Sequence, residues 1–143
     1  MILVHAARQL VSRLYIHPIL VNFTAALVPV SLGSDVLERL TRRGSLRETG
    51  WWTMLYAACV TPFTALAGWL FWMKDDVGVH GMAIHKWLGT SLAVLIPALA
   101  LWRSRFWKAD RRPNGLYLGA GLVLLAALIL QGHLGGVQVF KDM

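Results

Sequence analysis

Four long apolar stretches constrain this chain more than any other feature of its sequence. They run approximately over residues 15–37, 51–73, 82–102 and 116–134 and take up most of the 143 residues. A helix needs about 20 mostly apolar residues to cross the hydrocarbon core of a bilayer. Because backbone polar groups in lipid must find partners within the protein, spans of this length are expected to be α-helices. The sequence therefore predicts an all-α integral membrane protein with a single domain over residues 1–143.

Short connections between the stretches favour an up-down-up-down four-helix bundle. In that topology the first and third helices run in the same direction and lie diagonally opposite each other. Gly135 and Gly136 are expected to end the fourth helix, and no inverted repeat is apparent. Ahead of the first span we expect a short amphipathic helix on the membrane surface. Apolar residues recur there at helical spacing: Leu3, Ala7, Leu10 and Leu14.

The distribution of charge predicts how the spans are oriented. Only 15% of the residues are charged, and the net charge is +7. Nine Lys and Arg residues lie on the side that holds the connections after the first and third spans, against five on the other side. Short cytoplasmic loops carry the excess of basic residues, so both termini are expected on the periplasmic side of a bacterial inner membrane. The basic loops indicate topology and contact with anionic lipid, not nucleic acid.

Two carboxylates lie near the basic end of the first span. Asp35 and Glu38 are expected to reach toward the interface or to pair with Arg39 or Arg42, which are close in sequence.

Histidines gather on the side opposite the basic loops. His17 begins the first span and His85 lies about one turn into the third, so the two are at similar depth on diagonal helices. A haem with one imidazole on each face of the iron fits between such helices. Gly89 follows His85 by four residues on the same helical face, where it would let a flat porphyrin approach the backbone. Lys86 lies near enough to the rim to pair with a propionate.

Three further polar residues lie at comparable depth. His133 closes the fourth span and is a candidate alternative ligand or hydrogen-bond partner. Asn22 lies roughly one turn below His17, and Gln131 lies two residues before His133. We expect either residue to form a hydrogen bond with a neighbouring helix or to contact a quinone ring or a haem edge. A copper or zinc site built from His17, His85 and His133 is an alternative, since imidazole suits both metals.

The beginning and the end of the chain resemble a bacterial family of predicted membrane proteins, domain of unknown function 2231. Residues 16–27 read Ile-His-Pro-Ile-Leu-Val-Asn-Phe-Thr-Ala-Ala-Leu, and the family's first helix typically reads His-Pro-x-x-Val-His-Phe-Pro-x-Ala-Leu. Residues 132–140 are similar to its usual Gly-Gly-x-Leu-Val-Tyr ending, and Ala65, Gly68 and His85 also look like the family. Asn22 and Thr24 replace the family's second histidine and its proline. Some relatives look fused to Rieske-type iron–sulfur domains, which implies a redox setting.

These observations predict a small b-type cytochrome-like electron-transfer subunit. It would bind one haem b near the periplasmic face through His17 and His85, and exchange electrons with a periplasmic carrier or a quinol. One alternative is a non-catalytic accessory subunit of a larger membrane complex, a role that suits short loops and many interfacial tryptophans. The other is the copper or zinc protein described above. Either role as a subunit is more expected than that of an enzyme acting alone.

Overall fold

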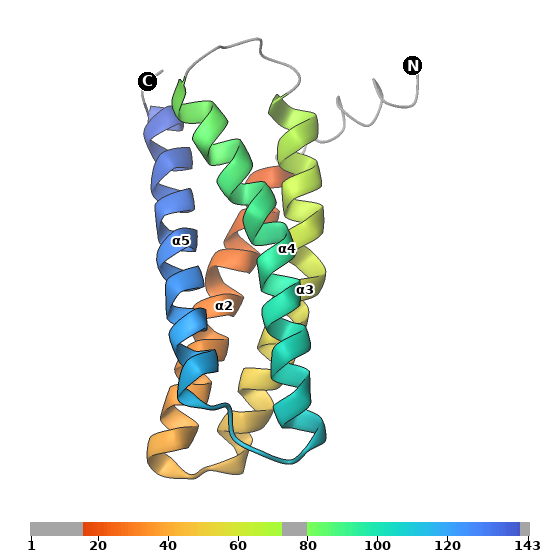
Figure 1. Ribbon diagram of the computed structural model, residues 1–143. Coiled ribbons are helices and arrows are strands. Elements are labelled where there is room, and N and C mark those ends of the chain that lie inside the picture. The colour runs from red at the N-terminus through yellow and green to blue at the C-terminus, as the bar shows by residue number, and fades with distance from the viewer. Residues whose placement is uncertain (1–15, 73–79, 141–143) are drawn as a thin grey trace.

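The structure, a computed structural model, describes residues 16–72 and 80–140 (Figure 1). They form α2 (Ile16–Thr41), α3 (Gly44–Trp72), α4 (His80–Lys108) and α5 (Gly115–Phe140). The helices alternate in direction, and each one packs against its two neighbours around the bundle. Over the described ranges the backbones of α2 and α4 do not come close to each other, and neither do those of α3 and α5. The predicted all-α bundle with diagonal first and third spans is confirmed, while the amphipathic segment expected before residue 16 lies outside the described residues.

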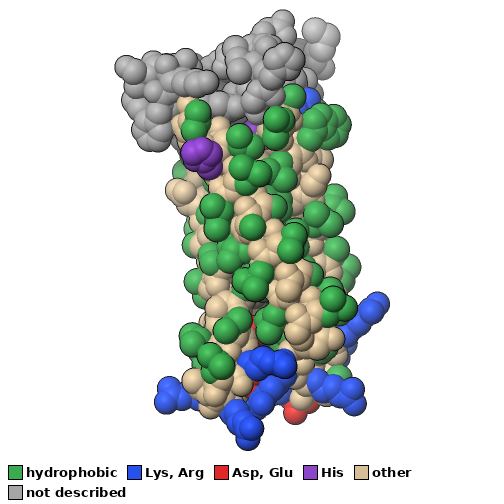
Figure 2. Space-filling model, turned by 60° about the vertical axis from the view of Figure 1, so that its left-hand side comes forward, with side chains coloured by type: hydrophobic (Ala, Val, Ile, Leu, Met, Phe, Trp, Pro, Cys, Tyr) green, Lys and Arg blue, Asp and Glu red, His purple; other side chains and the backbone are tan. Residues whose placement is uncertain are grey.

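The outside of the bundle is suited to lipid. All four helices are long and apolar enough to cross a membrane. Large hydrophobic side chains are exposed along the helices, and Lys and Arg side chains gather around one end (Figure 2). We call this the basic end, which is formed by residues 39–47 and 103–115, and we call the opposite end the histidine end. The chain is a multi-pass membrane protein whose helices contact the bilayer.

The helices extend beyond the apolar spans. At the basic end, α2 runs to Thr41 and α3 already begins at Gly44. Charged side chains in this part can reach the interface while the backbone remains helical. At the histidine end, α5 continues through Gly135 to Phe140, so the expected helix end at the two glycines is wrong. A glycine inside a helix costs only about 1 kcal/mol, which packing against neighbouring helices can offset.

The two connections at the basic end are closed by similar backbone turns. Arg42 and Asp110 both have left-handed backbone angles, with φ of 59° and 52°. A residue in this conformation commonly ends a helix and turns the chain away from the helix axis. After the second turn, the side chain of Asn114 accepts a hydrogen bond of 2.9 Å from the backbone N–H of Tyr117 and caps α5. These turns hold the basic ends of successive helices together.

The core runs along the middle of the bundle. It consists of buried apolar side chains from all four helices, among them Val28, Leu32, Met54, Ile96 and Tyr117. Helices α2 and α5 come close at Gly121, where a Cβ atom would collide with the side chain of Leu32. The histidines lie at one end of this core, and the buried charges lie at the other end.

Candidate functional site

His17 and His85 are held at the same end of the bundle on the diagonal helices α2 and α4. Both side chains are half-buried. His17 Nδ1 lies 3.0 Å from the backbone oxygen of Thr64 on α3, and His85 Nδ1 lies 3.2 Å from the backbone oxygen of Gln131 on α5. Because a carbonyl oxygen can only accept, Nδ1 donates the proton in each ring. In the neutral imidazole the lone pair then lies on Nε2, the atom that can ligate a metal.

A glycine accommodates each imidazole ring. A Cβ atom on Gly68 would lie 2.8 Å from His17 Cε1, and one on Gly135 would lie 2.9 Å from His85 Cε1. Each glycine follows the residue that supplies the carbonyl by four positions, one helical turn later. Each histidine ring therefore lies against a carbonyl and a glycine of the neighbouring helix. Any larger residue at either glycine would displace the ring.

This equivalence extends over the length of the bundle. The separation is 47 residues between His17 and Thr64, and 46 between His85 and Gln131. Four pairs of structurally special residues on α2, α4 and the turns that follow them share a separation of 68: His17 and His85, Pro29 and Pro97, Asp35 and Arg103, and Arg42 and Asp110. Buried positions match in the same way: Thr24 and Leu92, Val28 and Ile96, Ser31 and Leu99, and Leu32 and Ala100. The hairpins α2–α3 and α4–α5 thus carry corresponding residues at a nearly constant separation, which is the pattern of a parallel internal repeat.

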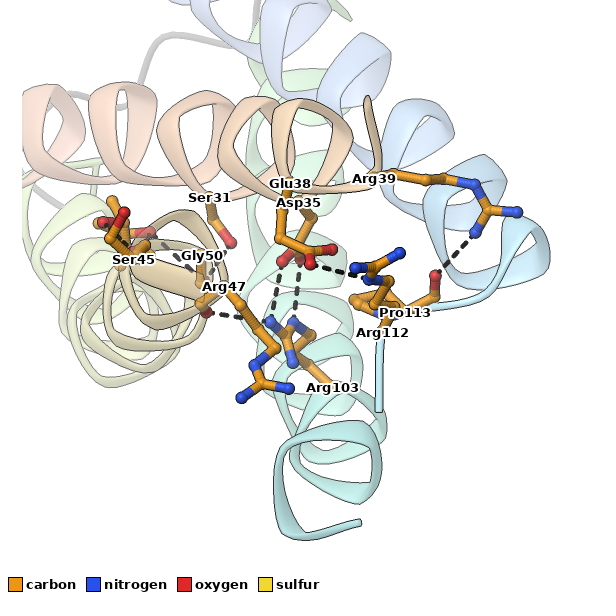
Figure 3. A network of polar contacts seen from close by, with 12 residues as sticks. Ser31, Asp35, Glu38, Arg39, Ser45, Arg47, Gly50, Arg103, Arg112 and Pro113 are labelled. Carbon is orange, nitrogen blue, oxygen red and sulfur yellow. Dashed lines mark hydrogen bonds and ion pairs between the residues drawn. The ribbon is translucent and has the colours of Figure 1, made fainter. Parts of the chain in front are cut away.

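The repeat brings opposite charges together at the basic end (Figure 3). Arg103 Nε and Nη2 donate to the two oxygens of Asp35 at 2.9 and 2.8 Å, and both side chains are 0% exposed. Arg103 Nη2 also donates to the backbone oxygen of Arg47 at 3.2 Å. Asp35 and Arg103 occupy equivalent positions of the two hairpins and therefore neutralise each other's charge directly. At the histidine end the equivalent positions carry identical imidazoles, and each one binds a carbonyl of its own hairpin instead.

The partners expected for Asp35 and Glu38 within their own helix and the turn after it are wrong. Glu38 accepts a hydrogen bond of 2.8 Å from Arg112 Nε, while Arg39 donates to the backbone oxygen of Pro113 at 3.2 Å. Asp35 and Glu38 are buried, whereas Arg39 is exposed. The carboxylates therefore pair with arginines that reach them from other parts of the bundle.

Gln131 is the closest polar partner of His85. Its side-chain Nε2 donates to His85 Nε2 at 3.3 Å, and its backbone oxygen accepts from His85 Nδ1. The same side chain fills the space beside Gly89, where a Cβ atom would lie 2.8 Å from Gln131 Nε2. The sequence indicates Gln131 as a polar residue near this depth, but it does not indicate its contact with His85 or the contacts of Gly68 and Gly135 with the histidine rings. A glycine four residues after each carbonyl is the signal that could have identified these contacts.

The other predicted site residues lie further from the bundle interior. His133 and Asn22 are exposed on α5 and α2. The ammonium of Lys86 lies 3.7 Å above the ring of Trp69, where it forms a cation–π contact. Among the described residues, no three His, Cys, Asp or Glu side chains are grouped so that they could hold a metal ion. The three-histidine copper or zinc site is therefore not assembled in this part of the chain.

Residues 13–143 match the family described as predicted membrane protein (DUF2231). The chain belongs to this family. The resemblance seen at both ends of the sequence is thereby confirmed over nearly the whole chain. No curated protein and no solved structure shows significant similarity to the chain.

Proposed function

We propose that this member of the DUF2231 family is a small membrane subunit that binds one b-type haem between His17 and His85 and takes part in electron transfer. The observation that carries the proposal is that the two imidazoles have the same tautomer and the same kind of hydrogen-bond partner. Each donates Nδ1–H to a backbone carbonyl and has its lone pair on Nε2. Ligand histidines typically use this arrangement, because the hydrogen bond fixes the ring and raises the basicity of the ligating nitrogen.

The residues around the histidines fit such a group. Two equivalent ligands on diagonal, parallel helices suit a six-coordinate iron, and bound haem supplies reversible one-electron chemistry. Gly68 and Gly135 leave room for the two imidazole rings, and Gly89 leaves room for the side chain of Gln131. Gln131 Oε1 is buried and has no hydrogen-bond partner among the described residues, which indicates that a polar group is accommodated there. Ligation by His85 requires the amide of Gln131 to move from Nε2 of that ring.

The residues of the chain have separate tasks in this proposal. The carbonyls of Thr64 and Gln131 orient the rings, and the two glycines facing the rings allow the close approach. Lys86 adds positive charge at the histidine end, in a position to pair with a propionate after release from Trp69. A quinol or a periplasmic carrier is the proposed redox partner, and other membrane subunits are the proposed neighbours.

The basic end is proposed to face the cytoplasm. Exposed arginines and a lysine surround the two connections there, including Arg42, Arg43, Arg105 and Lys108 (Figure 2). Basic residues in short loops favour the cytoplasmic side of a bacterial inner membrane. The histidine site then lies near the periplasmic face, with both termini on that side.

Measuring the haem content of the purified protein tests the proposal directly. Protein purified in detergent from cells supplied with ample haem is expected to show a sharp reduced α-band and about one haem per chain in a pyridine haemochrome assay. His17→Ala and His85→Ala should each lose the haem while the chain still inserts into the membrane. His133→Ala is the matched control, because His133 is exposed near the same end, and it should keep the haem. An absent Soret band in the wild-type protein would contradict the proposal and favour the accessory-subunit alternative.

A further inference from the structure

Several buried polar atoms at the basic end make no hydrogen bond within the described residues. They are Glu38 Oε2, Arg47 Nε, Arg103 Nη1 and Tyr117 Oη. Arg103 and Tyr117 are 0% exposed, so bulk solvent does not reach their side chains. Buried polar groups in native proteins nearly always have a partner, either in the protein or in ordered water. These atoms therefore indicate a bound polar species at the end of the bundle opposite to the histidine site.

Three of these atoms belong to residues in or near the buried ion pair. Arg103 uses Nε and Nη2 to bind Asp35, which leaves both N–H groups of Nη1 directed elsewhere. The ring of Tyr117 packs edge-on against Trp102, the residue that directly precedes Arg103 on α4. Glu38 lies one turn after Asp35 on α2, and Figure 3 shows the two carboxylates next to each other above Arg103. The side chains come from α2, α4 and α5, so they converge from three of the four helices.

The chemistry of these atoms selects the ligand. Arg103 Nη1 only donates, Glu38 Oε2 only accepts when ionised, and the Tyr117 hydroxyl can do both. The carboxylate of Glu38 disfavours an anion, and the guanidinium of Arg103 disfavours a cation. A small neutral molecule that donates and accepts satisfies all three groups. We propose that this cluster is a buried hydration site in which Arg103 Nη1, Tyr117 Oη and Glu38 Oε2 hold ordered water. Buried water in proteins typically makes about three such hydrogen bonds.

Glu38 connects this site with the surface. Its Oε1 accepts from Arg112, whose side chain is 44% exposed, while the Glu38 side chain itself is only 4% exposed. The carboxylate thus lies between the exposed guanidinium and the buried cluster. Water in the site exchanges with the aqueous phase past Glu38 and Arg112, without entering the apolar core.

Water-edited solid-state NMR of the full chain in liposomes tests the proposal. Magnetisation from water is expected to reach the guanidinium of Arg103 at short mixing times, as early as that of exposed Arg112. Ile96 is the dry control, because it is also 0% exposed but lies in the apolar core. Transfer to Arg103 that is as late as transfer to Ile96 would overturn the proposal.

A variant identifies the groups that hold the water. Tyr117→Phe removes the hydroxyl without changing charge, so transfer to Arg103 should decrease while the helical signals of the bundle remain. Unchanged transfer in a folded Tyr117→Phe protein would refute the role of Tyr117 in the site. If the variant does not fold, the comparison of Arg103 with Ile96 in the wild-type protein still decides the proposal.

Discussion

Removing one partner of the buried ion pair should destabilise the bundle far more than removing both. In Arg103→Met, the carboxylate of Asp35 loses its two hydrogen bonds of 2.9 and 2.8 Å in a place where its side chain is 0% exposed. Breaking a buried pair in this way typically costs about 3–5 kcal/mol. At about 1.4 kcal/mol for each factor of ten, the ratio of folded to unfolded protein should fall between about a hundred-fold and a few thousand-fold.

The double variant Asp35→Leu with Arg103→Met removes both charges. Replacing a buried pair by apolar residues is often nearly neutral, so this protein should recover most of the lost stability. Arg47→Met is the control, because it breaks the ion pair with Asp110, whose side chain is 84% exposed, and should cost less than about 1 kcal/mol.

Reversible unfolding in mixed detergent and SDS micelles, followed by circular dichroism, measures these free energies. A loss in Arg103→Met as small as that in Arg47→Met would refute the reasoning. So would a double variant that is no more stable than Arg103→Met alone.

Two glycine substitutions test the packing at each end of the core. Gly135→Ala places a Cβ atom 2.9 Å from His85 Cε1, so haem content should fall, whereas Gly132→Ala meets nothing within 4 Å and should leave it unchanged. Equal haem content in the two variants would contradict the proposal that Gly135 makes room for the ring of His85. Gly121→Ala drives a Cβ atom into a leucine side chain of α2 and should cost about 1–3 kcal/mol in the same unfolding assay. Gly119→Ala faces open space and should instead be neutral or stabilise by up to about 1 kcal/mol; a loss comparable to that of Gly121→Ala would refute this packing argument.

The internal repeat shows what sequence reasoning can overlook. His17 and His85 have the same separation as Pro29 and Pro97, and both pairs are visible in the sequence. Few other residues match, since the equivalent positions often differ in chemistry, as Asp35 and Arg103 do. A search for similar residues misses such pairs. The fold reveals them because several buried positions and the two left-handed turn residues recur at the same separation in both hairpins.

The sequence by itself determined the membrane bundle. Long apolar runs with short connections leave helices as the only stable way to satisfy the backbone in lipid, and they make α2 and α4 diagonal. This is enough to place His17 and His85 at one end. Only the tertiary structure decided which groups meet, because a contact depends on how each helix is rotated about its axis. That rotation turns Asp35 toward Arg103 and leaves His133 exposed. It also places each histidine against a glycine and a carbonyl of the neighbouring helix.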